Sequence, residues 1–136
     1  MDTNYTDLTD DQVLQKLLAV DTVPEKTVAM PRLGIPVTIK ALTGKQVYSI
    51  RERCTVTNQT KRGSVDKLDN EQFNCALIVA ATVKPNWSDS NLVSKFSASG
   101  PEEVIKRLLL AGELTQLSDA VLDLSGYNTE LEEVKN

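Results

Sequence analysis

The sequence predicts a single α+β domain in which helices dominate. Its 136 residues have an ordinary globular composition, with 40% apolar and 25% charged residues, and domains cluster near this length. Apolar residues alternate with period two in one stretch near the N-terminus, whereas helical spacing recurs along most of the chain. Thr9, Thr43 and Asp69 are each followed three residues later by Gln, and this capping pattern marks three helix starts.

The first elements predicted are a short amphipathic helix and a β-hairpin. The helix begins after Thr9 and ends before Pro24, because four apolar residues recur at helical spacing, namely Val13, Leu14, Leu17 and Leu18. Over residues 26–42 the apolar period changes to two, which predicts two strands joined by a turn at residues 31–34. Pro31 and Pro36 are expected to keep the neighbouring strand ends free of continuous pairing, as on a sheet edge. We expect no other hairpin.

Two helices and a loop are predicted next. The first helix begins after Thr43 and turns three apolar residues inward, which are Val47, Ile50 and Cys54. Residues 55–68 are polar, aperiodic and contain Gly63, so we expect a mobile loop there. The helix over 70–83 is apolar around nearly its whole circumference. We therefore expect it at the buried centre of the domain.

The C-terminal third predicts a helical hairpin. After a short helix capped by Ser88, Gly100 and Pro101 open a helix with acidic residues in its first turn. Gly112 interrupts the pattern, and Gly126 ends the second helix. That helix carries an apolar stripe of Leu114, Leu117, Val121 and Leu124.

The chain divides into one domain over residues 1–127 and a flexible acidic tail over residues 128–136. Its N-terminus has no basic and apolar signal pattern, and no apolar run approaches the ~18 residues of a membrane span. We therefore expect a cytoplasmic protein that does not bind a membrane. In that compartment Cys54 and Cys75 are expected to be free, partly buried thiols rather than a disulfide.

The composition also limits the chemistry of the chain. With no His and two Cys, it cannot supply four nitrogen and sulfur ligands to a zinc ion, and we expect neither a metal nor a cofactor. A net charge of −4 argues against nucleic-acid binding. Residues 40–67 nevertheless hold seven cations against two acids. This basic stripe is interpreted as a solvated helix face.

No group of residues is typical of a catalytic site. Ser64 and Lys67 have the spacing of serine–lysine acyl enzymes, but they lie in the expected loop and no second element of that motif is present. Gly44-Lys45 lacks the upstream Gly and the following hydroxyl of a phosphate loop. The paired carboxylates are explained by helix first turns and a solvated helix face; they are Glu102 with Glu103 and Asp119 with Asp123. We therefore expect a non-enzymatic protein.

The leucine-rich stretch over residues 108–117 holds more large apolar side chains than one narrow helix face can bury. These side chains either pack internally or form a patch that receives a partner's amphipathic helix. Trp87 is either a packing lid or part of a partner contact. The candidate partner-binding residues are Leu110, Leu114, Leu117, Val121 and Trp87.

Three segments together resemble a known protein family. They are the strand and helix start Val37–Arg51, the loop Pro85–Ser88 and the leucine-rich end Pro101–Tyr127. The most specific features of the last segment are Gly112-Glu113 and Ser125-Gly126-Tyr127. Over about residues 5–127 the sequence resembles the XkdN-like tail assembly chaperones of long-tailed phages and Bacillus prophages.

The resemblance implies a non-enzymatic protein that acts in the bacterial host cytoplasm during tail morphogenesis. It implies that the protein binds the tape measure protein, a long and largely helical chain, and keeps it soluble while subunits of the tail tube protein assemble around it. The tail tube protein is a second partner that this role allows. The resemblance also implies absence from the finished virion. The alternative is a structural tail component, such as a connector or completion protein, that the particle retains.

Overall fold

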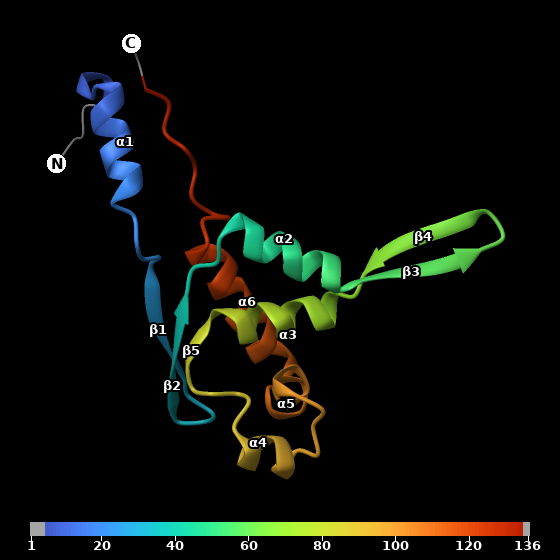
Figure 1. Cartoon of the computed structure of the whole chain (residues 1–136). Helices are drawn as coiled ribbons and strands as arrows, with labels where there is room; N and C mark the ends of the chain where they lie inside the picture. The colour runs from blue at the N-terminus through green and yellow to red at the C-terminus, as the bar shows by residue number, and fades with distance from the viewer. Residues whose placement is uncertain (1–4, 135–136) are drawn as a thin grey trace.

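One central helix, α3 (Asn70–Ala81), organises the fold (Figure 1). The computed structural model describes residues 5–134. Around α3 pack α2 (Gly44–Arg53), α5 (Pro101–Leu108), α6 (Ala111–Leu124) and strand β2. The buried side chains of α3 are Phe73, Cys75, Ala76, Leu77, Ile78 and Ala81. The prediction that this helix forms the buried centre is confirmed.

A three-stranded antiparallel sheet lies at one end of α3, with β1 (Glu25–Met30), β2 (Ile35–Lys40) and β5 (Thr82–Lys84) in the order β1-β2-β5. The predicted first hairpin and its turn over residues 31–34 are confirmed by the β1–β2 register. The sequence does not predict strand β5, because residues 82 and 83 are assigned to the helix expected over 70–83. That helix ends at Ala81, and the chain continues directly as a strand against β2.

The expected mobile loop over residues 55–68 is wrong. Strands β3 (Thr55–Thr60) and β4 (Gly63–Leu68) form a second antiparallel hairpin, which projects away from the helices (Figure 1). Gly63 has a φ of +115°, a backbone conformation that favours glycine at the tight turn. The fold is α+β, as predicted, but it contains two hairpins instead of one.

Polar side chains on one face of this second hairpin explain why a polar sequence forms strands. The Thr57 hydroxyl donates a hydrogen bond of 2.7 Å to Asp66 Oδ1, and Gln59 Nε2 donates one of 3.0 Å to Ser64 Oγ. Such cross-strand pairs stabilise a hairpin. The sequence pattern alone does not reveal them, because partners lie several residues apart.

The remaining helices are the short 3₁₀ helix η1 (Tyr5–Asp7), α1 (Asp10–Leu18) and α4 (Ser90–Lys95). The predicted capping boxes at Thr9 and Thr43 are confirmed. Asp89, rather than the expected Ser88, caps α4.

The break between the two C-terminal helices also differs from the prediction. It falls at Leu109 and Leu110, and Gly112 lies inside α6. The Leu110 backbone N–H donates a 2.8 Å hydrogen bond to the Glu113 side chain, and this contact starts α6 before the glycine.

The C-terminal tail is exposed over residues 128–134 and has no regular secondary structure there. The last two residues of the predicted tail over 128–136 lie outside the described residues. The boundary at residue 127 stays a prediction.

We expect Leu77→Ala to destabilise the protein strongly. Leu77 lies on α3 and is 0% exposed, so its truncation leaves a cavity where α3 meets its neighbours, at a cost of about 2–5 kcal/mol in the free energy of unfolding. Chemical denaturation measures this loss. Leu131→Ala is the matched control, because Leu131 is 98% exposed; equal stability of the two variants would contradict the central role of α3.

Candidate partner-binding surfaces

The five candidate partner-binding residues do not form one patch. Leu110 is 56% exposed and Leu114 is half-buried, whereas Leu117, Val121 and Trp87 are buried. Of the two alternatives that the sequence left open, internal packing therefore holds for Leu117, Val121 and Trp87. Leu110 and Leu114 are the two that remain accessible.

Packing against α3 buries Leu117 and Val121. Helix α6 has its most extensive contact with α3, and Leu117 and Val121 project into the shared core. The Trp87 indole N–H donates a 3.0 Å hydrogen bond to the Thr82 hydroxyl, which in turn donates to the Ile78 carbonyl at 2.6 Å. Trp87 is thus a packing residue with a satisfied polar group, the first of the two interpretations that its sequence position allowed.

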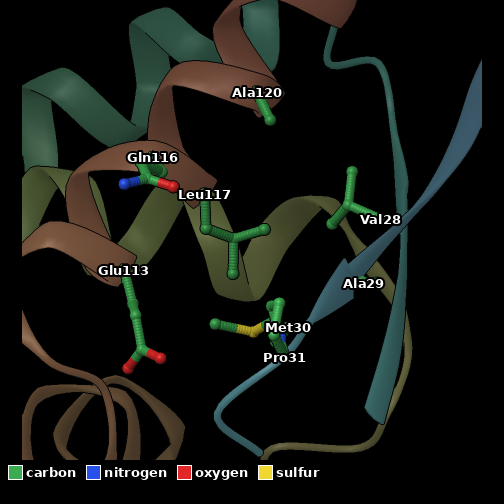
Figure 2. A pocket seen from close by; sticks show the side chains of 8 residues that line it. All are labelled: Val28, Ala29, Met30, Pro31, Glu113, Gln116, Leu117 and Ala120. Carbon is green, nitrogen blue, oxygen red and sulfur yellow. The ribbon is translucent and has the colours of Figure 1, made fainter. Parts of the chain in front are cut away.

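A shallow pocket lies between β1 and α6 (Figure 2). It has a volume of about 200 Å³, and Leu117 points toward Met30 across it. Val28 and Ala120 extend the apolar wall, while the Glu113 carboxylate stands on its rim. Leu110 lies one helical turn before the pocket residues of α6. This part of the molecule therefore combines an exposed leucine with a nearby apolar pocket.

An ion pair fixes the geometry of this region. Arg32, in the β1–β2 turn, donates to the Glu113 carboxylate from Nη2 at 2.8 Å and from Nε at 3.0 Å. The same Nη2 donates a 2.8 Å hydrogen bond to the carbonyl oxygen of Leu108, at the end of α5. Arg32 therefore connects the first hairpin to both C-terminal helices. Its hydrogen bonds lower the pKa of Glu113 below the ordinary value, and Glu113 raises the pKa of Arg32.

A second apolar surface lies on the N-terminal arm, defined here as residues 5–23. No residue of α1 is buried, and Leu14, Leu17 and Leu18 are each at least half exposed. Figure 1 shows α1 projecting from the sheet end of the molecule. The sequence predicted this amphipathic helix but not its exposure. The signal that could have indicated it is the acidic first turn, Asp10-Asp11, on a helix too short to cover much core.

The basic stripe over residues 40–67 follows α2 into the second hairpin. Lys45, Arg51 and Arg53 are exposed, and the Arg51 guanidinium lies 5.4 Å from the centre of the Phe73 ring. The stripe is a solvated helix face, as interpreted, and it continues as exposed cations on the hairpin, which are Lys61, Arg62 and Lys67.

The structure gives no support to catalytic roles for Ser64, Lys67 and Glu103. Ser64 and Lys67 are three residues apart on β4, so their side chains project from opposite faces of the strand. Glu103 accepts a 2.8 Å hydrogen bond from the Ser99 hydroxyl and pairs with Arg107 at 2.7 Å. Those partners, Ser99 first, lower the pKa of Glu103. Glu103 is therefore a structural residue of α5.

The two cysteines are free, as predicted, and both are fully buried rather than partly buried. Burial raises the pKa of Cys75 to about 11, and it also raises the pKa of Cys54. Burial therefore favours the protonated, less nucleophilic form of both thiols. Across residues 5–134 no three acidic or cysteine side chains gather as a metal-binding group, and no helix there has the length and hydropathy to cross a membrane.

Comparisons with known proteins agree on one family. The model of the family described as phage XkdN-like tail assembly chaperone proteins matches residues 14–136. The Bacillus subtilis protein YqbN, which is uncharacterised, is 29% identical over 103 residues, covering 74% of this chain and 69% of that protein. The XkdN protein of the phage-like element PBSX, also from Bacillus subtilis, is 26% identical over 103 residues, covering 74% and 70%.

A solved structure supports the fold. The crystal structure of YqbN superposes with a TM-score of 0.58 at 20% sequence identity, over 80% of this chain and 90% of that chain. At this identity the likeness concerns the fold.

We expect Glu113→Gln to lower the melting temperature in a pH-dependent manner. Because Arg32 holds the folded-state pKa of Glu113 below 4.5, the ion pair stabilises the fold above that ordinary pKa, and its contribution disappears as the pH falls through the lowered value. The difference between wild type and variant should therefore be largest near neutral pH and vanish in strong acid. Thermal unfolding followed by circular dichroism measures it.

The control for this prediction is Glu130→Gln, which changes an exposed acid of the tail. It should leave the melting temperature unchanged at every pH. A Glu113→Gln difference that stays constant from neutral pH into strong acid would show that lost packing, and not the lost ion pair, causes the change.

Proposed function

The chain belongs to the phage XkdN-like tail assembly chaperone family, and from this membership we propose that it binds the tape measure protein and keeps it soluble during tail morphogenesis. The protein would act in the host cytoplasm without catalysing a reaction. It would be released as tail tube subunits enclose the tape measure protein. The tail tube protein is a second proposed partner, because its subunits would replace the chaperone on the tape measure protein.

Leu110 is the observation that carries the proposal. Its large apolar side chain is 56% exposed, yet its backbone N–H is tied to Glu113, which Arg32 holds in place. The leucine is therefore presented from a fixed junction rather than from a flexible loop. A backbone that is already held in place loses little conformational entropy on binding.

The surroundings of Leu110 suit an amphipathic helix. Leu114 adds half-buried apolar surface, and the pocket between β1 and α6 can receive an apolar side chain of a helix lying along α6. The surface is small, which favours weak, reversible binding. Reversibility suits a chaperone that must give up its partner when the tube forms.

We expect Leu110→Ser to weaken binding without unfolding the protein. The chaperone is co-expressed with a fragment of its cognate tape measure protein, and the soluble fraction and co-purified amount of that fragment are measured. Wild type should keep the fragment soluble, while Leu110→Ser should reduce the co-purified amount by about tenfold, which corresponds to the ~1.4 kcal/mol of a buried leucine contact. Leu131→Ser, at the 98% exposed tail residue, is the matched control. No effect of the wild-type chaperone on solubility would overturn the proposal.

Leu114→Ser probes the half-buried neighbour of Leu110. Its effect on the co-purified amount is read together with its melting temperature. A loss of binding at an unchanged melting temperature assigns Leu114 to the partner surface, and a large fall in melting temperature assigns it to the core.

Purified particles test the alternative role as a connector or completion protein. A chaperone that leaves before the tail is complete should be absent from mass spectra of purified phage or phage-like particles. Its detection there at a fixed ratio to the tail tube protein would favour a retained structural component. A lysate from the same culture is the positive control, because the protein must be detectable in it.

A further inference from the structure

We propose that the N-terminal arm of one copy docks on the β3–β4 hairpin of a second copy, in a head-to-tail contact. Both surfaces are exposed and apolar, and their charges are opposite. This contact uses neither Leu110 nor the pocket between β1 and α6, so it is independent of the proposed chaperone site.

The arm supplies an apolar stripe with acidic residues at one end. At 100° per residue, the four apolar residues of α1 fall on one face, and Asp10 lies in line with them one turn earlier. Asp7 and Asp11 add two more acids against the single cation Lys16. None of these charges takes part in the three ion pairs of the described residues.

The hairpin supplies an apolar face with cations. The β3–β4 register pairs Val56 with Lys67 and Asn58 with Val65, which places these four side chains on one face. Val56 and Val65 are each about half exposed. The acid of β4, Asp66, projects from the other face, where Thr57 donates to it.

Additional features extend this face at both ends. The turn adds Lys61 and Arg62, which are exposed. At the other end a hollow of about 330 Å³ separates the hairpin face from the start of α3. The carboxylate of Asp69 on its rim already accepts the Gln72 backbone N–H as a helix cap. The face is thus basic and apolar, complementary to the arm.

A second copy is the occupant because one copy cannot bring its own two surfaces together. Figure 1 shows α1 and the β3–β4 hairpin on opposite sides of the helical body. Pairing of two α1 helices would bury apolar surface but would leave the cations of the hairpin without partners. A two-stranded hairpin without cover is marginally stable in water, so docking would also stabilise β3–β4.

The contact has two consequences for assembly. In a docked pair, one copy keeps a free hairpin and the other keeps a free arm, so head-to-tail docking continues into a ring or an open chain. Each interface involves one short helix and one face of a hairpin, which is at the small end of specific interfaces. We therefore expect weak association that depends on concentration and that salt reduces.

Sedimentation velocity of the full chain tests the proposal at about 1 μM to 1 mM protein, the range over which weak contacts form. At low salt the average mass should rise above the 15.0 kDa of one chain, and near 1 M salt it should fall back, because charges are then screened within about 3 Å. The arm variant Leu14→Ser/Leu17→Ser and the hairpin variant Val56→Ser/Val65→Ser should each remain monomeric. All four side chains are exposed and lie outside the core, so the packed helical body stays intact in both variants.

Mixing the two variants is the decisive step. The intact arm of the hairpin variant can dock on the intact hairpin of the arm variant, whereas the other two surfaces are disabled. The mixture should therefore form a 1:1 heterodimer of twice the chain mass and nothing larger. A symmetric contact does not predict this result.

Matched controls distinguish this contact from nonspecific association. Gln15→Ser changes the polar face of α1, and Leu131→Ser changes the exposed apolar residue of the tail; both variants should associate like wild type. The proposal is overturned by a wild type that stays monomeric throughout, by association of either double variant alone, by a mixture that forms no heterodimer, or by loss of association in Leu131→Ser.

Discussion

The fold depends on a central helix, α3, that is buried over most of its length. Because α3 carries buried residues around most of its circumference, it is stable only when other elements surround it. Helices α2, α5 and α6 and strand β2, which come from different parts of the sequence, pack around α3 and cover it. Segments whose apolar faces are used in this way have no surface left for partners, which is why Leu117 and Val121 belong to the core and Leu110, at the junction of two surrounding helices, does not.

A single cationic side chain connects the elements that surround the exposed Leu110. Arg32 reaches from the first turn to the last two helices, where it contacts the Glu113 carboxylate and the Leu108 carbonyl. The hairpin, α5 and α6 therefore cannot shift independently near Leu110. Helix α1 and the β3–β4 hairpin differ from this surface, because they project away from the helical body (Figure 1). The molecule thus combines one fixed surface with two projecting ones, and each suits a different kind of contact.

Local signals in the sequence predicted the starts of α1, α2 and α3, the first hairpin and the buried central helix, because caps and apolar periodicity act within a few residues. They failed where distant residues decide. The β3–β4 hairpin depends on cross-strand polar pairs such as Thr57 with Asp66, and the helix break at Leu110 depends on Glu113, which Arg32 positions from far away in the chain. Exposure was the least predictable property, because Leu17 and Leu117 occupy similar amphipathic patterns and only the packing of the whole chain buries one of them.

The burial of Trp87 gives the molecule an intrinsic optical probe. It is the only tryptophan of the chain, and its indole belongs to the buried core, where it donates a hydrogen bond to the Thr82 hydroxyl. Tryptophan fluorescence therefore reports on the integrity of the helical body around α3. Neither α1 nor the β3–β4 hairpin contains a tryptophan. Contacts made by these two elements should therefore leave the Trp87 emission largely unchanged. Unfolding of the body and events at its periphery can accordingly be followed as separate signals in one sample.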